Sequence, residues 1–368
     1  MRIRAAVLEE FGQPLVVQEV ELAEPKAGEV LVRLVACGVC HTDLYTASGA
    51  DPSGYSPTVL GHEGAGVVEK IGADVSSVRP GDNVVTLFSP QCRECIHCLS
   101  DRTNLCLAIR EQQNLGFLPD GTTRLGRDGE SIRHFMGCST FAEHTVMPEI
   151  ALAKVSPDAP PEHTCLFACG LSTGLGAAMN TAKVEPGSTC GVFGAGMVGL
   201  GAVAGCRIQG AERIVAVDLS PGRLELAKGQ GATDTLVGGP DAVDQILELT
   251  DGLGADYTFE ATGNVAVMRQ AVESARMGWG LCTVAGVAGR GEVLEVVPRF
   301  LITGRRIAGS SFGGVKGRDQ VPALVDRALA GEIDVEPFVS RRIGLDDVNH
   351  AFELMEAQDG IRSVIEFN

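Results

Sequence analysis

The sequence predicts an α/β protein with two domains, one rich in β-strands and one built on a doubly wound parallel sheet. Up to about residue 90, short apolar stretches are separated by Gly and Pro, a pattern typical of β-strands joined by tight turns. Residues 189–218 combine a strand, a glycine-rich turn, a helix and a second strand, and strand and helix patterns then alternate to about residue 312. A chain of 368 residues is also too long for one ordinary core.

The expected strands of the first part are 29–35, 64–71 and 83–87, with Pro80-Gly81-Asp82 as a turn between two of them. Residues 122–134 are polar and rich in Gly, which predicts an excursion on the surface.

In the second part, the pattern predicts helices at 171–183 and 200–210 and strands at 189–193 and 214–217. Further strand and helix patterns follow at 257–260, 265–276, 281–287 and 306–310. The tail predicts helices at 320–330 and 345–356 and a last strand at 363–367. We see no internal repeat.

Composition and charge exclude several classes of function. The formal net charge is -17, so nucleic acid or an anionic membrane surface would repel the chain. The N-terminus has no signal-peptide pattern, and no stretch of about 18 apolar residues predicts a membrane span. We therefore expect a cytoplasmic protein, in which the 12 Cys indicate metal binding rather than disulfides.

Three separated motifs offer ligands for one metal ion. Cys40, His62 and Cys169 would leave one position of a tetrahedral zinc open, which is the arrangement of a catalytic zinc site. Thr42 adds a hydroxyl and Asp43 a carboxylate beside the first ligand. The alternative, that the two Cys are buried apolar residues, is the common situation for a free thiol.

A second group of four cysteines, Cys92, Cys95, Cys98 and Cys106, lies within a single short segment. Four thiolates complete a tetrahedral shell, so this spacing predicts a closed, structural zinc site. His97 lies inside the segment but is not needed as a ligand. The alternative of four unrelated thiols fits this spacing poorly.

The turn from Gly194 to Gly199 follows the strand at 189–193 directly and opens the next helix, with Met197 and Val198 inside it. Gly194 permits the tight turn, Gly196 lets the backbone approach a pyrophosphate, and Gly199 allows close packing of helix and strand. Asp218 ends the following strand, where it would hold ribose hydroxyls and repel a 2′-phosphate. The unit predicts NAD binding, although a βαβ unit without a cofactor is the alternative.

The chain resembles the zinc-dependent alcohol dehydrogenases of the medium-chain dehydrogenase/reductase family over essentially its full length. The motifs that carry the resemblance are Cys40-His41-Thr42-Asp43, Gly61-His62-Glu63, the four-cysteine segment, Cys169-Gly170-Leu171-Ser172-Thr173-Gly174 and Gly194–Gly199. The sequence looks most like class III, the S-(hydroxymethyl)glutathione dehydrogenases, through Ser48–Pro52, Thr103–Cys106, Met136-Gly137 and Phe312-Gly313-Gly314.

The resemblance implies a GroES-like catalytic domain at 1–170 and 313–368 and a Rossmann domain at 171–312. It implies two zinc ions per chain, held by the ligand sets already named. Asp43 would orient His62 and Glu63 would lie behind the metal. Thr42 would take up the proton of an alcohol while hydride passes to NAD. The substrate pocket is expected between the two domains.

The resemblance also assigns further contacts to the cofactor and the substrate. His41 and Arg362 would contact the pyrophosphate, Arg223 the adenosine ribose, and Val287 the cofactor at the end of its strand. The substrate residues would be Asp51, Phe88, Arg110, Phe135 and Met136, although ordinary core packing is the alternative for the two Phe and the Met.

Two positions depart from class III. Ser53 stands where that class usually has Glu, and Met277, before Gly278-Trp279-Gly280, stands where it usually has Lys. Both positions are credited with holding glutathione, whereas Asp51 and Arg110 match.

The expected reaction is NAD-dependent oxidation of a primary alcohol or of a hydroxymethyl-thiol adduct. The alternatives are a strict S-(hydroxymethyl)glutathione dehydrogenase and a cofactor-binding redox sensor without turnover. The resemblance further suggests a homodimer or homotetramer, assembled through the nucleotide domains.

Overall fold

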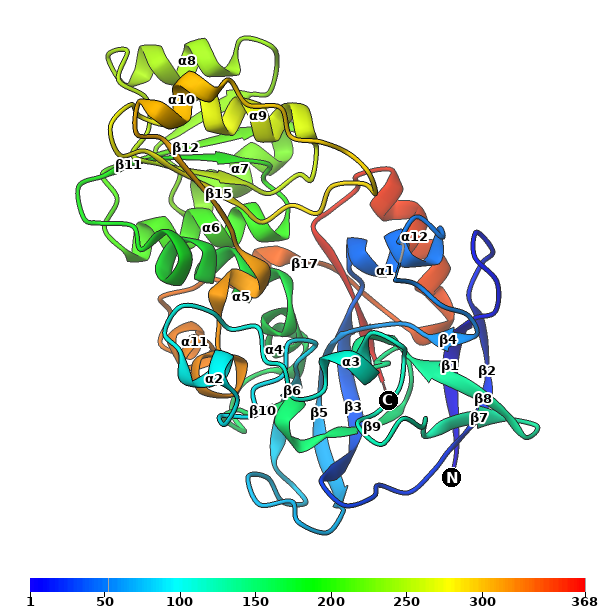
Figure 1. The fold of residues 1–368 in the computed structure, drawn as a ribbon. Coiled ribbons are helices and arrows are strands. Elements are labelled where there is room, and N and C mark those ends of the chain that lie inside the picture. The colour runs from blue at the N-terminus through cyan, green and yellow to red at the C-terminus, as the bar shows by residue number, and fades with distance from the viewer. Residues whose placement is uncertain (52, 368) are drawn as a thin grey trace. The chain divides into compact units, whose positions relative to one another are not determined.

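The computed structural model describes residues 1–51 and 53–367 (Figure 1). The chain divides into two compact units, each containing segments far apart in the sequence. Unit 1 comprises Met1–Cys169, Lys316–Gly331 and the residues from Val335 onward, and unit 2 comprises Gly170–Val315 and Glu332–Asp334.

Unit 1 contains a closed barrel with the strand order β1-β2-β7-β8-β4. Its strands are β1 (Arg2–Leu8), β2 (Val16–Leu22), β4 (Thr58–Val59), β7 (Leu125–Arg127) and β8 (Glu130–His134). The prediction of a surface excursion at 122–134 is therefore wrong, because β7 and β8 complete the barrel. These strands are too short for an alternating pattern to stand out, yet Leu125 and Ile132 are buried in the core.

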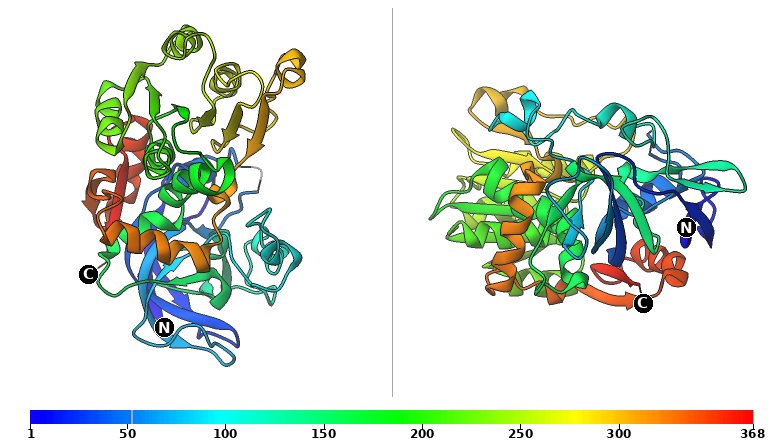
Figure 2. Two further views of the ribbon diagram at one scale, coloured as in Figure 1. Left: turned by 90° about the vertical axis from the view of Figure 1, so that its left-hand side faces the viewer. Right: turned by 90° about the horizontal axis from the view of Figure 1, so that it is seen from below.

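A second sheet of unit 1 has the order β10-β6-β5-β3-β18-β17, with β9 paired to β3. Its strands are β3 (Glu29–Gly38), β5 (Glu63–Ile71), β6 (Asn83–Thr86), β9 (His144–Pro148), β10 (Leu152–Lys154), β17 (Val339–Ile343) and β18 (Arg362–Glu366). The strands predicted at 29–35, 64–71, 83–87 and 363–367 are confirmed, with no end more than three residues from the prediction. The C-terminal strand β18 pairs with β3, so the tail returns to the N-terminal half of the chain (Figure 2).

Short helices connect these strands. They are α1 (His41–Ala47), α2 (Ile96–Leu99), α3 (Arg110–Gln113) and α4 (Pro161–Thr164), and the tail adds α11 (Gly317–Leu329) and α12 (Val348–Glu356). The two helices predicted in the tail are confirmed, although a 3-10 turn, Leu345–Asp347, precedes α12.

Unit 2 is built on one parallel sheet with the order β13-β12-β11-β14-β15-β16 among the described residues. The strands are β11 (Thr189–Phe193), β12 (Arg213–Asp218), β13 (Asp234–Val237), β14 (Tyr257–Glu260), β15 (Leu281–Val284) and β16 (Arg306–Gly309). The order reverses between β11 and β14, which is where such sheets bind ligands at the carboxyl ends of their strands. The predicted doubly wound sheet is confirmed.

Helices cover both faces of this sheet (Figure 1). They are α5 (Gly170–Gly176), α6 (Met197–Ile208), α7 (Pro221–Gln230), α8 (Ala242–Leu249), α9 (Val265–Glu273) and α10 (Pro298–Ile302). Within the unit, α6 packs beside α7 and α8 beside α9. Helix α5 continues into a π-helical turn, Ala177–Ala182, so the helix predicted at 171–183 is present in two parts. Helix α6 begins at Met197 rather than at residue 200, because Gly196 already takes the N-cap position.

No helix in the described part of the chain is both long enough and apolar enough to cross a membrane.

A buried polar network ties the barrel to the second sheet inside unit 1. The Arg124 guanidinium donates to both carboxylate oxygens of Glu29, with Nε···Oε2 at 2.8 Å and Nη2···Oε1 at 2.5 Å. The Arg124 backbone N–H donates to Nε2 of His134 at 3.1 Å. Since Nε2 is an acceptor, the ring is neutral and carries its proton on Nδ1. All three side chains are buried.

Acid is expected to destabilise unit 1 through His134. Burial lowers the pKa of His134 to about 3, whereas an exposed His titrates near about 6.5. The unfolded state therefore binds more protons between these values, and the free energy of unfolding falls as the pH drops through that window. From pH 7 to pH 5 this residue should account for a loss of about 2 kcal/mol.

The variant His134→Gln accepts the same backbone N–H bond but does not titrate. Urea unfolding of wild type and variant at both pH values measures the difference. An identical acid-induced loss in the two proteins would contradict the role of His134.

Candidate active site

The structure brings the three predicted ligands of the open metal site together in unit 1. Cys40 is the N-cap residue of α1, two residues after the end of β3, and His62 immediately precedes β5. Cys169 follows a 3-10 turn, Cys165–Ala168. The ligand atoms of Cys40, His62, Glu63 and Cys169 lie within 4.8 Å of one another.

Asp43 connects two of these motifs. Its Oδ2 accepts the backbone N–H of Cys40 at 2.9 Å, and its Oδ1 accepts that of Gly61 at 3.2 Å. Oδ1 also lies 3.0 Å from Nδ1 of His62. One buried carboxylate in the first turn of α1 therefore fixes both the loop of His62 and the orientation of its ring.

The His62 ring fits a metal ligand. Nδ1 is paired with Asp43, whereas the buried Nε2 has no hydrogen-bond partner among the described atoms. A buried nitrogen without a partner is costly, and a metal ion satisfies it. Burial alone would lower the pKa of His62, but Asp43 and Cys40 outweigh it and leave the pKa well above its usual value.

The two thiols also fit zinc, which binds cysteine as thiolate. The hydrogen bond from Cys169 lowers the pKa of Cys40 well below its usual value, against the effect of burial. The same shared proton raises the pKa of Cys169. Two sulfurs and one imidazole nitrogen form a donor set that leaves one tetrahedral position for an oxygen ligand. The Thr42 hydroxyl lies 3.8 Å from the Cys40 sulfur, beside the donor set.

Glu63 is the fourth member of this cluster, and its carboxylate pairs with Arg362 of β18. The guanidinium contacts both carboxylate oxygens, at 3.1 and 3.2 Å, and its Nη1 donates to the Val39 carbonyl at 2.9 Å. Burial raises the pKa of Glu63 to about 7, although Arg362 opposes the rise. A Cβ at Gly38 would overlap Oε2 of Glu63, so only glycine leaves room for this carboxylate.

Two predicted substrate residues, Phe88 and Phe135, meet the His62 ring edge-on. Both ring centroids lie 5.8 Å from that of His62, at interplanar angles of 88° and 72°. Met136 follows with a left-handed backbone, φ 51. Phe88 and Phe135 thus form an apolar wall beside this metal ligand.

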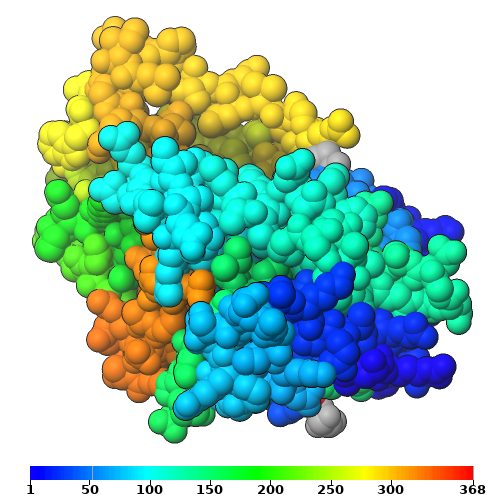
Figure 3. All heavy atoms as spheres, turned by 60° about the horizontal axis from the view of Figure 1, so that its bottom comes forward, coloured from blue at the N-terminus to red at the C-terminus, as the bar shows by residue number. Residues whose placement is uncertain are grey.

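The four-cysteine segment forms the second cluster of sulfurs, also within 4.8 Å of one another. Backbone N–H groups point at the sulfurs: Cys95 N lies 3.2 Å from the Cys92 sulfur, and Cys98 N lies 3.4 Å from the Cys95 sulfur. His97 is not part of the cluster, and its Nδ1 lies 2.6 Å from the Leu105 carbonyl oxygen. The segment, cyan in Figure 3, lies on the surface.

The tail of the chain holds this segment in place. The Lys316 ammonium, just before α11, donates to the carbonyls of Cys98 and Ser100 at 2.8 and 2.5 Å. Arg93 pairs with Asp319 of α11, with Nη2···Oδ1 at 2.6 Å.

The polar substrate residues lie elsewhere in unit 1. Arg110 begins α3. Asp51 lies in the loop after α1, where its Oδ2 accepts the Thr46 hydroxyl at 2.9 Å. Its Oδ1 accepts both the N–H and the hydroxyl of Ser53, at 2.8 and 2.7 Å. The carboxylate therefore already has three donors from its own loop.

In unit 2, the glycine-rich turn has the geometry that the pattern predicts. Gly194 has a φ of 92, and a Cβ there would lie 2.7 Å from Thr262 Cγ2. A Cβ at Gly196 would meet nothing within 4 Å, whereas one at Gly199 would overlap the Gly194 carbonyl oxygen. Open space at the second glycine and close packing at the third fit a pyrophosphate at the N-terminus of α6.

Asp218 ends β12 beside this turn. Its Oδ2 accepts the N–H of Ala195 at 2.6 Å, and its Oδ1 accepts the N–H of Ser220 at 2.8 Å. The other predicted cofactor residues lie at helix starts and strand ends. Met197 and Val198 begin α6, Arg223 lies in the first turn of α7, Val287 is exposed beyond β15, and His41 is exposed at the start of α1.

Glu260 is a residue that the sequence reasoning missed. It ends β14 as Asp218 ends β12, and that shared position was the available signal. Its buried Oε1 accepts the N–H groups of Thr262 and Gly263 at 2.7 and 2.9 Å, which shapes the loop that packs on Gly194.

Neutralising Asp218 is expected to weaken discrimination against NADP. Asp218→Asn keeps an oxygen for the Ala195 N–H but removes the charge that repels a 2′-phosphate. The ratio of kcat/KM for NAD to that for NADP should fall about tenfold or more in Asp218→Asn and in Asp218→Ala, since nearby like charges cost more than about 1.4 kcal/mol. An unchanged ratio in both variants would refute this role.

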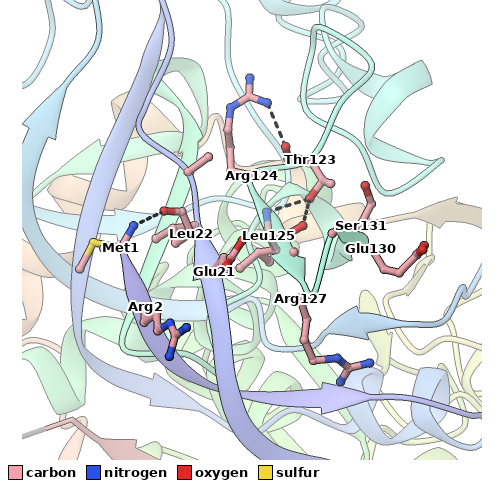
Figure 4. Close-up of a pocket in the computed structure, with 13 residues that line it drawn as sticks. Met1, Arg2, Glu21, Leu22, Thr123, Arg124, Leu125, Arg127, Glu130 and Ser131 are labelled. Carbon is pink, nitrogen blue, oxygen red and sulfur yellow. Dashed lines mark hydrogen bonds between the residues drawn. The ribbon is translucent and has the colours of Figure 1, made fainter.

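A separate hollow of about 510 Å³ lies among strands β1, β2, β7 and β8 (Figure 4). Beside it, the terminal amine of Met1 donates to the Leu22 carbonyl at 2.7 Å. Its lining shares no residue with the sites described above, so the hollow is distinct from the metal cluster.

Comparisons with known proteins agree with the two clusters and the glycine-rich turn. The family model for the alcohol dehydrogenase GroES-like domain matches residues 26–157, and the model for zinc-binding dehydrogenases matches residues 197–330. The chain is 52% identical to the alcohol dehydrogenase class-3 of Myxine glutinosa, over 99% of this chain and 97% of that protein. It is 50% identical to the S-(hydroxymethyl)glutathione dehydrogenase of Escherichia coli O1:K1, over the full length of both.

Solved structures of dehydrogenases have the same fold as this chain. An alcohol dehydrogenase zinc-binding domain protein from Burkholderia ambifaria has a TM-score of 0.94 at 35% identity, covering 100% of this chain and 99% of that one. The benzyl alcohol dehydrogenase of Acinetobacter calcoaceticus has a TM-score of 0.93 at 32% identity, covering 100% of both chains. The chain therefore belongs to the zinc-containing alcohol dehydrogenases of the medium-chain dehydrogenase/reductase family, and its activity is the NAD-dependent oxidation of an alcohol.

Proposed function

We propose that the alcohol is a primary one carried on a thiol, a hydroxymethyl-thiol adduct that is oxidised to the thioester. The similarity to an alcohol dehydrogenase class-3 and to an S-(hydroxymethyl)glutathione dehydrogenase supports this, since it extends over nearly the whole chain at 50% identity or more. The observation that carries the chemistry is the cluster of Cys40, His62 and Cys169, with the Thr42 hydroxyl beside it.

Each residue of the site has a role in this reaction. Cys40, His62 and Cys169 hold the zinc, and Asp43 keeps the His62 ring oriented. Zinc supplies the Lewis acidity that lowers the pKa of an alcohol, and NAD accepts the hydride. The Thr42 hydroxyl would accept a hydrogen bond from the substrate hydroxyl while donating its own proton to another acceptor, so it can relay the substrate proton outward without becoming charged.

A general primary or aromatic alcohol is the second candidate. Ser53 and Met277 replace two charged residues that class III usually carries, and the Asp51 carboxylate already accepts three hydrogen bonds from Thr46 and Ser53. The two replacements remove charge that could hold glutathione, and the Asp51 carboxylate has less capacity left to accept hydrogen bonds from it. The similarity to a benzyl alcohol dehydrogenase supports the same candidate.

Steady-state kinetics separates the two candidates. Initial rates of NADH formation are compared for formaldehyde plus glutathione, for a medium-chain primary alcohol and for benzyl alcohol. A thiol-adduct enzyme should turn over the formaldehyde mixture only when thiol is present, with a kcat/KM at least about tenfold above that for the free alcohols. Equal or better rates with free alcohols, and no dependence on thiol, would contradict the first candidate.

The assignment of the two units belongs to the same proposal. We propose that residues 1–170 and 313–368 form the zinc-binding domain and residues 171–312 the NAD-binding domain. The location of both sulfur clusters in unit 1 and of the glycine-rich turn in unit 2 supports this division.

We further propose that the enzyme is a cytoplasmic homodimer or homotetramer, assembled through unit 2. Strand β16 is an edge strand of its sheet and exposes Ile307, and nearby Trp279, Leu301 and Ile302 are 54%, 48% and 84% exposed. An exposed apolar edge strand is a surface on which a second copy can add its own edge. The absence of disulfides among the 12 cysteines fits a reducing compartment.

A further inference from the structure

Gln113, the last residue of α3, makes an unusual pair of contacts. Its Nε2 donates to two backbone carbonyls, that of Phe88 at 2.8 Å and that of Met136 at 2.6 Å. Because both neighbours are acceptors, only the nitrogen of the carboxamide can lie at this point. Both N–H groups of one side chain are therefore used to join two segments that are 48 residues apart in sequence (136 − 88).

These two segments carry the apolar wall of the metal site. Phe88 and Phe135 contact the His62 ring edge-on at centroid distances of 5.8 Å. Phe135 is followed at once by Met136, whose left-handed φ of 51 turns the chain so that its carbonyl faces Gln113. The Phe135 segment has local hydrogen bonds of its own, such as that from the Phe135 N–H to the Ser139 hydroxyl at 2.9 Å, whereas the Gln113 amide joins it to the Phe88 segment.

Local packing gives this amide little freedom. The Gln113 backbone N–H bonds to the Ile109 carbonyl at 2.9 Å, which fixes the end of α3. A Cβ at Gly137 would lie 3.4 Å from Nε2, so the neighbouring turn closes around the carboxamide. Arg110, a proposed substrate residue, begins the same helix. The short helix α3 therefore carries both the proposed polar substrate residue, Arg110, and the amide that contacts the wall, Gln113.

We propose that Gln113 is a positioning residue for the substrate: by joining the carbonyls of Phe88 and Met136, it fixes the wall beside His62 and so sets which alcohol chain lengths are oxidised well. The proposal rests on the proposed function, because the wall matters only if an alcohol binds beside the metal ligands. Gln113 acts through the wall and need not touch the substrate. A displaced wall misplaces a substrate that fills the pocket more than one that does not reach it.

The test uses the full-length zinc-loaded enzyme. Gln113→Met keeps an unbranched side chain of similar length but has no donor. We expect kcat/KM for a medium-chain primary alcohol to fall about tenfold, with less than about a twofold change for ethanol, because a shift of about 1 Å can cost up to a hundredfold. The zinc content and the KM for NAD should stay at wild-type values. A merely structural role would change the thermal stability without changing the ratio between the two alcohols.

Further variants sharpen the test. Gln112→Met, at the neighbouring position on the same helix, is the matched control and should leave the ratio unchanged. Gln113→Lys restores donors, and Lys316 of this chain already bonds to two carbonyls in this manner, so the ratio should recover at least in part. Gln113→Asn keeps the amide but is one methylene too short to reach both carbonyls, so its ratio between the two alcohols should equal that of Gln113→Met. It replaces Gln113→Met in the test if that variant does not fold.

A wild-type ratio in both Gln113→Met and Gln113→Asn, or the same loss in Gln113→Met and Gln113→Lys, would overturn the proposal. Inactivity of the wild-type enzyme toward both alcohols and the thiol adduct would instead contradict the proposed function.

Discussion

Replacing Cys169 or Cys40 by serine is expected to remove the zinc of the open site and nearly all turnover. The variant would leave one sulfur and the His62 nitrogen as ligands, and a serine hydroxyl is a poor ligand for zinc compared with a thiolate. The metal's Lewis acidity contributes several kcal/mol to the reaction barrier, and each 1.36 kcal/mol is tenfold in rate. We therefore expect kcat/KM to fall by about 10³-fold or more.

The measurements are steady-state rates and elemental analysis of each variant. One zinc per chain should remain, because the four-cysteine segment is a separate cluster. Cys165→Ala is the matched control, since Cys165 is a buried thiol that lies outside both clusters. It should keep two zinc ions and wild-type rates. Full activity in Cys40→Ser or Cys169→Ser would defeat the assignment of the catalytic metal.

Functional sites whose residues all lie within one short segment could be predicted from the sequence alone. Four Cys within one short segment permit few interpretations, and the strand, turn, helix and acid from 189 to 218 form one local unit. The same holds for most strands of unit 2, where short stretches rich in apolar residues alternate with helical patterns. Residue type suggested Cys40, His62 and Cys169 as ligands of one ion, but buried apolar Cys stayed an alternative until the family resemblance supported the metal site.

Contacts between distant segments could not be predicted, because no local pattern encodes them. The pairing of β18 with β3 places Arg362 beside Glu63, 299 residues away in sequence. Strands β7 and β8 were hidden because three to five residues with a glycine between them look like a loop. The two carbonyl contacts of Gln113 use backbone atoms, which leave no mark in the composition of either segment.

Replacing Cys95 by serine is expected to damage stability before chemistry. Cys95 contributes one of four sulfurs to the closed cluster, so three ligands would remain and the zinc should be lost. Zinc in a closed site contributes directly to folding, and the segment from 92 to 106 has little apolar packing of its own, since Ile96 and Leu99 are 74% and 72% exposed. Loss of a structural metal is among the largest single-residue effects, so the free energy of unfolding should fall by about 4 kcal/mol or more.

Loss of this zinc should also destabilise α11. The Lys316 ammonium, just before that helix, donates to the carbonyls of Cys98 and Ser100, and these two contacts depend on the fold of the segment. Cys40, His62 and Cys169 are held by other elements, so molecules of Cys95→Ser that remain folded should keep one zinc and most of their turnover at low temperature. His97→Gln is the control, because His97 lies in the same segment but outside the sulfur cluster; it should keep two zinc ions and wild-type stability. The measurements are the thermal unfolding temperature and the zinc content of the wild type and both variants. If Cys95→Ser lost one zinc yet unfolded at the wild-type temperature, the closed cluster would not have the structural role assigned to it.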